Sequence, residues 1–266
     1  MRKLLLLNFL FFLLSSWSTA QVDKMALKNA EFGISDFELI DQFLMVVPGV
    51  GSKSRDLLNA QSVKEHLMPV RKKTKKGSDL AYALTTCLEF YVNLGKNYKV
   101  NLSPDYISLL LTAQGKQWSS ADAMKLLSAD GTVSAAILPF GSEQLTSGVY
   151  ATEKYKILNY LHLFRQQTRD RQKVFETKKA LMRGNPVMVE LKASEQLAFV
   201  KETRLWDRFL AGNTPYHLVV VGFDEELEAF EVRNSAGAKW GTNGYLWLKY
   251  DDFGKAVANG YVIVPE

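Results

Sequence analysis

The stretch from Tyr216 to Tyr250 decides the fold, and it reads YHLVVVGFDEELEAFEVRNSAGAKWGTNGYLWLKY. Short apolar or alternating segments follow one another in it, and turns rich in Asp, Glu, Gly and Asn separate them. This pattern is typical of antiparallel strands joined as hairpins. His217 stands at the start of the first strand segment and Asn234 at the end of the second. Antiparallel pairing therefore places both side chains at the same end of the predicted sheet.

The same stretch resembles the C-terminal half of the papain-like cysteine peptidases. The resemblance lies in the order of its parts, which are His217, an apolar run, Gly222-Phe223, a strand, and then NSAGAKWGTNGY from Asn234 to Tyr245. In that family a neutral Asn side chain orients the catalytic imidazole without neutralising its charge. The resemblance therefore implies that His217 is the catalytic histidine and that Asn234 is its orienting partner.

A second segment, MPVRKKTKKGSDLAYA from Met68 to Ala83, is similar to the first active-site segment of the same family. Aligned on Gly77-Ser78, the resemblance places Asp79 where the family has its nucleophilic cysteine, at the N-terminus of a long central helix. It also places Lys73 where the family has the glutamine that stabilises the oxyanion. His217 follows Asp79 within the separation of about 130 to 150 residues expected between cysteine and histidine. Two catalytic positions are thus substituted.

Cys87, the one cysteine of the chain, is the alternative nucleophile. It lies about two turns further along the predicted helix, roughly 12 Å from the helix end whose dipole lowers a thiol pKa. We therefore predict a buried, unreactive thiol there. The carboxylate of Asp79 keeps the negative charge of a thiolate but lacks its nucleophilicity. We expect Asp79 and His217 to form an ion pair between the lobes.

The resemblance covers residues 62–266 and implies an α+β, papain-like fold with two lobes. The N-terminal lobe is expected to be helical, packed around the central helix, and the C-terminal lobe is expected to be an antiparallel β-barrel. Ser103 has the sequence context of a helix N-cap, and the segment Trp118-Ser119-Ser120-Ala121 is predicted to begin a second helix. The polar segment from Leu158 to Arg183 has a helical period and predicts one further helix, on which His162 would lie.

The N-terminus has the pattern of a signal peptide, with basic Arg2-Lys3, an apolar run and small residues up to Ala20. The apolar run is too short to span a bilayer. We predict a signal peptide over residues 1–20 and export to the periplasm or the outside of the cell, without stable membrane insertion. Residues 21–61 are predicted to be an N-terminal arm or a short pro-segment.

Composition adds few constraints. The chain has 266 residues, and a hydrophobic fraction of 47% is enough for a sizeable core. A net charge of +5 does not by itself indicate nucleic-acid binding, and we expect none. His66 and His162 have no second ligand at i+3 or i+4, so neither a metal nor a cofactor is expected. The oligomeric state is left open.

Three functions fit these observations. The first is an exported pseudopeptidase that binds peptides or a protein partner in the former active-site groove. The second is an active peptidase or amide hydrolase in which Asp79 acts as a base on water and His217 as an acid. The third is a structural module. The basic run from Arg71 to Lys76 is either a binding site for an anionic partner or a solvated loop. Ala236 stands where the family has a tryptophan that shields the His-Asn bond.

Overall fold

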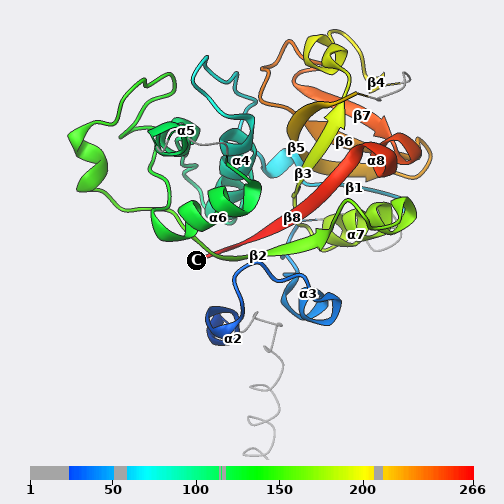
Figure 1. Ribbon diagram of the computed structural model, residues 1–266, viewed down its shortest axis with the longest axis horizontal. Helices are drawn as coiled ribbons and strands as arrows, with labels where there is room; N and C mark the ends of the chain where they lie inside the picture. Colours follow the sequence, from blue (N-terminus) through cyan, green and yellow to red (C-terminus); the bar gives the residue numbers. More distant parts are fainter. Residues whose placement is uncertain (1–23, 51–58, 114, 116–117, 207–211) are drawn as a thin grey trace, which may run out of the picture.

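The computed structural model describes residues 24–50, 59–113, 115, 118–206 and 212–266. The predicted signal peptide lies outside these residues. The α+β architecture with two lobes is confirmed: α4, α5 and α6 gather on one side of Figure 1, and the sheet lies beside them with α7 and α8. Among the described residues, no helix has the length and apolar character that a membrane span requires.

Three helices (α4, α5 and α6) follow one another in the first half of the chain, and most of the strands lie in the second half. The helices are α2 (Lys24–Asn29), α3 (Phe37–Phe43), α4 (Asp79–Asn93), α5 (Pro104–Ala113), α6 (Ser120–Ala129), α7 (Asp170–Met182) and α8 (Tyr250–Ala256). The strands are β1 (Ala60–Ser62), β2 (Ile157–Phe164), β3 (Val187–Ala193), β4 (Leu205–Trp206), β5 (Thr214–Asp224), β6 (Ala229–Arg233), β7 (Tyr245–Lys249) and β8 (Val257–Pro265).

The helical lobe is built around α4, which begins at Asp79 with Ser78 as its N-cap residue. Most residues of α4 are buried, so the helix lies at the centre of the lobe and not on its surface. The predicted starts of the next two helices are confirmed. Ser103 Oγ accepts from the backbone N–H of Tyr106 at the start of α5. Ser119 forms a capping box with Asp122 at the start of α6.

The sheet has the strand order β2-β8-β3-β5-β6-β7-β4, and β1 pairs with β5 outside this path. Neighbouring strands are antiparallel except β4 and β7. The hairpins predicted for the stretch from Tyr216 to Tyr250 are confirmed as β5, β6 and β7. On β3, Glu190 lies directly opposite His217 of β5. Facing residues of this kind have side chains on one face of the sheet, which sets up the site.

The single helix predicted from Leu158 to Arg183 is wrong in nearly all of its first half. Residues Ile157–Phe164 form strand β2, and only Asp170–Met182 form a helix. The strand is stabilised by its pairing with β8, about a hundred residues further on, which no local pattern reveals. His162 accordingly lies on β2, where its ring stacks on Tyr261 with centroids 4.6 Å apart.

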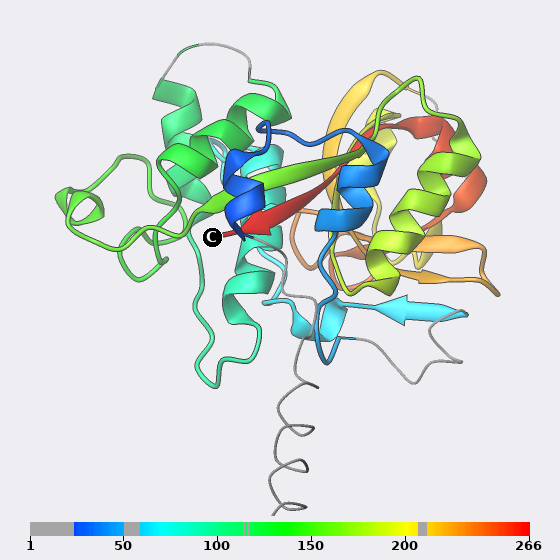
Figure 2. The same cartoon turned by 90° about the horizontal axis from the view of Figure 1, so that it is seen from below.

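The N-terminal arm is part of the folded body. Leu27, Ile40 and Phe43 are buried in the same core cluster as β2 and α7. The backbone N–H of Gly33 donates to Asn159 Oδ1 at 2.8 Å, which ties the arm to β2. Figure 2 shows α2 lying across β2 and α3 lying beside α7. These contacts involve elements that carry none of the predicted site residues. β1 spans the predicted boundary between residues 61 and 62, which itself remains a prediction.

Candidate active site

Asp79 is the first residue of α4 and lies among groups from both lobes. Lys73 Nζ is 2.8 Å from Asp79 Oδ1, and Ser235 Oγ donates to the same oxygen at 2.6 Å. The backbone N–H of Lys73 also donates to the Ser235 carbonyl at 2.7 Å. A carboxylate suits this position because a helix N-terminus carries partial positive charge. The two residues predicted from the resemblance as substituted catalytic positions therefore form an ion pair with each other.

The ion pair expected between Asp79 and His217 is not formed. Among the described residues, Asp79 pairs within 4.0 Å with Lys73, whereas His217 Nε2 lies 3.8 Å from Glu190 Oε1. The strand register explains the difference, because it puts Glu190 directly across from His217 on the same face. Lys73, six residues before Asp79, meanwhile supplies the positive charge at the helix start. The charges of the site are thus satisfied in two separate pairs.

Glu190 is held by three groups from three elements. Besides His217, Ser120 Oγ at the start of α6 donates to Oε1, and Asn259 Nδ2 of β8 donates to Oε2 at 2.6 Å. Burial acts to raise the pKa of Glu190, but these hydrogen bonds outweigh it and lower the pKa from 4.5 to about 2. The carboxylate is consequently ionised at neutral pH. Its side chain is 24% exposed, so it is open to the solvent between the lobes.

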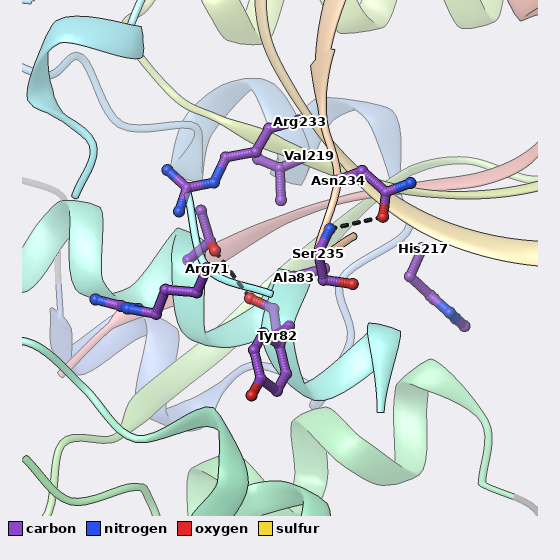
Figure 3. A pocket seen from close by; sticks show the side chains of 9 residues that line it. Arg71, Tyr82, Ala83, His217, Val219, Arg233, Asn234 and Ser235 are labelled. Atoms are coloured by element: carbon purple, nitrogen blue, oxygen red, sulfur yellow. Dashed lines mark hydrogen bonds between the residues drawn. The ribbon is translucent and has the colours of Figure 1, made fainter. Parts of the chain in front are cut away.

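Asn234 follows β6 and lines the same small cavity as His217, but the expected orienting contact with the imidazole is not formed. Its Oδ1 accepts from the backbone N–H of the next residue, Ser235, at 2.6 Å. Figure 3 shows the imidazole of His217 directed away from the Asn234 amide. No hydrogen bond joins these two side chains among the described residues. The local turn satisfies the amide, as Asn side chains commonly do next to their own backbone.

The basic run before α4 is largely neutralised. Arg71 donates to Glu89 and to Asn101, each at 2.6 Å, and Lys76 pairs with Glu143 at 3.1 Å. With Lys73 paired to Asp79, three of the five cations of this run have an anionic partner, whereas Lys72 and Lys75 make no ion pair within 4.0 Å among the described residues. The geometry does not support the interpretation of this basic run as an anion-binding site.

Two hollows adjoin the site. A small cavity of about 10 Å³, large enough for one water, is lined by Arg71, Tyr82, Ala83, Thr86, His217, Val219, Arg233, Asn234 and Ser235 (Figure 3). A wider hollow of about 460 Å³ lies on the other side of His217 and is lined by Ser78, Leu80, Ser108, Leu111, Thr112, Gly115 and Trp118 as well. Among the described residues no group of three or more His, Cys, Asp or Glu side chains is arranged to hold a metal ion.

Cys87 lies inside α4 and is 1% exposed. Burial raises the pKa of its thiol to about 12, with a small opposing effect of Arg233. Because the thiolate is the nucleophilic form, this thiol has no means of attacking a substrate in the native fold.

Comparison with known proteins identifies the family of the chain. A model of the papain family of cysteine proteases matches residues 55–264. The chain belongs to the papain family. The solved structures that it matches include a cysteine protease of Carica candamarcensis (14% identity, 77% of this chain and 98% of that one, TM-score 0.60). Xylellain, a cysteine protease from Xylella fastidiosa, is 18% identical; the match covers 88% of this chain and 95% of that one, with a TM-score of 0.58. The bromelain protease from Ananas comosus is 16% identical; the match covers 78% of this chain and 99% of that one, with a TM-score of 0.59. Compared with curated protein sequences, the chain has no significant match.

These similarities confirm the papain-like fold of this family member, and at such identities they show the fold alone. The hydrogen-bond and ion-pair partners of the site residues are known only from the tertiary structure. Ser120, Glu190, Ser235 and Asn259 were not predicted from the sequence. One signal was available: Glu190 is an acidic residue inside the apolar strand Val187 to Leu191, and a charge in a buried strand calls for a partner.

Proposed function

We propose that this papain-family member is an exported pseudopeptidase, which binds a peptide or a protein segment in the groove between its lobes and does not cleave it. The proposal includes the assignment of Asp79 to the nucleophile position and of Lys73 to the oxyanion position. The observation that carries it is the direct pairing of these two residues, 2.8 Å apart, with Ser235 on the same carboxylate oxygen.

Chemistry supports the loss of activity. Amide hydrolysis in this family needs a thiolate at the helix start, activated by an imidazole, and a fixed donor for the oxyanion. A carboxylate at Asp79 gives no stable acyl intermediate. Lys73, engaged by that carboxylate, is not free to stabilise an oxyanion. His217 faces Glu190 instead of Asp79 or Asn234, so the nucleophile, base and orienting groups are each bound to other partners.

The groove supports binding. His217 and the wider hollow beside α5 remain partly exposed between the lobes, and apolar side chains line the hollow together with hydroxyl groups. A concave site of this kind, with a few polar groups at its rim, is the usual form of a ligand site. We infer that an extended peptide lies across it.

The test compares wild type, Asp79→Cys and Asp79→Ala on a broad panel of peptide substrates, with and without a thiol alkylator. Wild type and Asp79→Ala should show no hydrolysis, while both bind peptides of the panel in fluorescence anisotropy. Asp79→Cys should show at most weak hydrolysis that the alkylator abolishes. Hydrolysis by wild type that resists the alkylator and disappears in Asp79→Ala would favour the alternative, with Asp79 as base and His217 as acid.

Export is tested separately. We expect the exported protein to begin at or near Gln21, after the small residues that a signal peptidase requires. Intact mass spectrometry of the protein recovered outside the cytoplasm measures this directly. A mass that still includes the apolar run from Leu4 to Leu14 contradicts the proposal.

A further inference from the structure

A hollow of about 570 Å³ opens on the sheet where β1, β5, β6 and β7 lie side by side. The strand register produces it. Ser62 of β1 faces Gly222 of β5, which in turn faces Glu231 of β6, and the next residue in this row is Trp247 of β7. Facing residues share one face of the sheet, and Gly222 has no side chain, so the row is open between Ser62 and Glu231. None of the described residues that line this hollow also lines either hollow beside His217.

An ion pair forms part of the wall of this hollow. Lys64 Nζ is 2.5 Å from Glu231 Oε1 and lies 4.0 Å from the centre of the Tyr245 ring, so the ammonium is held by two groups. The side chain of Glu231 is 9% exposed and that of Lys64 is 41% exposed. The ion pair takes one of the three N–H groups of the ammonium and one of about four acceptor positions of the carboxylate. A ligand therefore meets a donor and an acceptor that are already fixed side by side.

The other two carboxylates that line the hollow have partners of their own. Asp224 Oδ1 accepts from two backbone N–H groups of the turn after β5, at 2.9 and 3.0 Å, and Glu65 Oε1 lies 3.3 Å from His66 Nε2. Three carboxylates beside one ammonium make the hollow unfavourable for an anion. A cation would have to compete with Lys64 for the buried Glu231. The ligand that suits the pair is therefore uncharged, with neighbouring groups that both donate and accept hydrogen bonds.

Trp247 adds an apolar surface next to this pair. It is half-buried and lines the hollow, and it lies directly opposite Glu231 in the strand register. An indole has a large apolar surface. A sugar ring has an apolar face of C–H groups, and its neighbouring hydroxyl groups donate and accept hydrogen bonds at the rim. A sugar therefore matches both the indole and the ion pair, as ligands of concave sites with a few polar groups do.

We propose that this hollow is a binding site for an uncharged sugar unit of an oligosaccharide. The ring packs on Trp247, one hydroxyl oxygen accepts from the ammonium of Lys64, and the neighbouring hydroxyl donates to the carboxylate of Glu231. Hydrogen bonds to charged groups are stronger than those between neutral groups. The hollow shares no described residue with the groove of the proposed function, so a sugar and a peptide can be bound at the same time.

The experiment measures the binding of four tetrasaccharides to the full chain by isothermal titration calorimetry. Cellotetraose and the tetramer of N-acetylglucosamine are neutral, tetragalacturonate is an anion, and the tetramer of glucosamine is a cation. At least one neutral tetramer should bind about tenfold more tightly than either charged one. Its affinity should be the same at low and at high salt, because the ligand carries no charge to be screened.

Three variants place the sugar in this hollow. Lys64→Met and Trp247→Leu should each weaken the binding of the neutral tetramer about tenfold or more. Ser62→Phe should do the same while it keeps the ion pair and the indole, because the new ring fills the space beside Gly222. Ser62 is exposed on a strand, where an aromatic residue is well tolerated, so this variant remains informative if another one fails to fold.

Lys178→Met is the matched control. Lys178 is paired with Glu225 at 2.7 Å and lies 4.0 Å from the centre of the Tyr250 ring, which repeats the surroundings of Lys64 at a place outside the hollow. This variant should bind the neutral tetramer as wild type does.

Every other outcome overturns the inference. If wild type binds neither neutral tetramer, the hollow is not a sugar site. Tighter binding of the glucosamine tetramer, or an affinity that falls as salt rises, shows a site for cations instead. Equal losses in Lys178→Met and Lys64→Met show a general effect of removing a lysine, and full affinity in Ser62→Phe shows that the sugar binds elsewhere. None of these results bears on the peptide groove, which the peptide panel tests separately.

Discussion

At the scale of single residues, the fold suppresses the reactivity of the Cys87 thiol. It lies in the interior of α4, and burial raises its pKa to about 12. We predict that iodoacetamide leaves the native protein unmodified and adds one label after unfolding in guanidinium, as measured by intact mass. Asp79→Cys is the control, because its new thiol at the helix start should react in the native state. Native labelling of wild type contradicts the prediction.

The cluster of Asp79, Lys73 and Ser235 gives a second prediction. Both partners contact Asp79 Oδ1, and the pair is partly exposed, with Lys73 at 38%. Ser235→Ala and Lys73→Met should therefore each lower the free energy of unfolding by about 1 kcal/mol. In an Asp79→Ala background both effects should shrink towards zero, because their common acceptor is gone. Urea unfolding of the variants measures this, and undiminished effects in that background argue against the cluster.

The lowered pKa of Glu190 predicts how the free energy of unfolding depends on pH. Its pKa is about 2 in the folded protein, below the ordinary value of 4.5. The stability it contributes is therefore fully present above pH 4.5. It is lost as the pH falls from 4.5 towards 2, since the unfolded chain takes up the proton first. Glu190→Gln should flatten the stability curve in this range. Urea unfolding at several acidic pH values tests this; an unchanged slope in Glu190→Gln contradicts it.

At the scale of elements, the end of α7 connects the N-terminal arm to the sheet. Gly184 follows the helix with φ +82°, and an added Cβ would lie 3.0 Å from Val47 Cβ and 3.1 Å from Val50 Cβ. The backbone N–H of Val47 donates to the Arg183 carbonyl at 2.9 Å, so the arm cannot easily move away. Gly184→Ala therefore combines an unfavourable backbone conformation with a steric clash.

We predict that Gly184→Ala lowers the free energy of unfolding by about 2 kcal/mol or more. Gly95→Ala is the control, because Gly95 also has positive φ, +66°, but has no atom within 4 Å of an added Cβ. It should cost about 1 kcal/mol, the backbone part alone. The difference between the two variants in urea unfolding measures the contact with the arm. If both variants lose the same free energy of unfolding, the contact of Gly184 with the arm contributes nothing measurable.

At the scale of the whole molecule, one core cluster connects the two lobes. Leu84 and Leu88 of α4 belong to the same buried cluster as Met188, Val219 and Ile263 of the sheet. Hydrogen bonds from Ser235 to Asp79 and from Ser120 to Glu190 also cross between the lobes. A core shared in this way should unfold as one unit. We predict coincident transitions by tryptophan fluorescence and far-UV circular dichroism in urea. Two separated transitions would show that the lobes unfold independently.

The sequence by itself determined the elements whose signals are local. The hairpins of β5, β6 and β7, the helix starts at Ser103 and Ser119, and the buried character of Cys87 depend on period, caps and distance along one helix. These patterns act over a few residues, so they can be read without knowing the rest of the fold.

Only the tertiary structure decided which charges meet. β2 is a strand because β8 pairs with it, and His217 faces Glu190 because β3 lies beside β5 in that register. Ser235 reaches Asp79 across more than 150 residues of chain. Side-chain pairing between distant segments depends on register and packing, which spacing in sequence does not encode. The sequence therefore placed Asp79, His217 and Asn234 near one another, while the fold gave each of them a different partner.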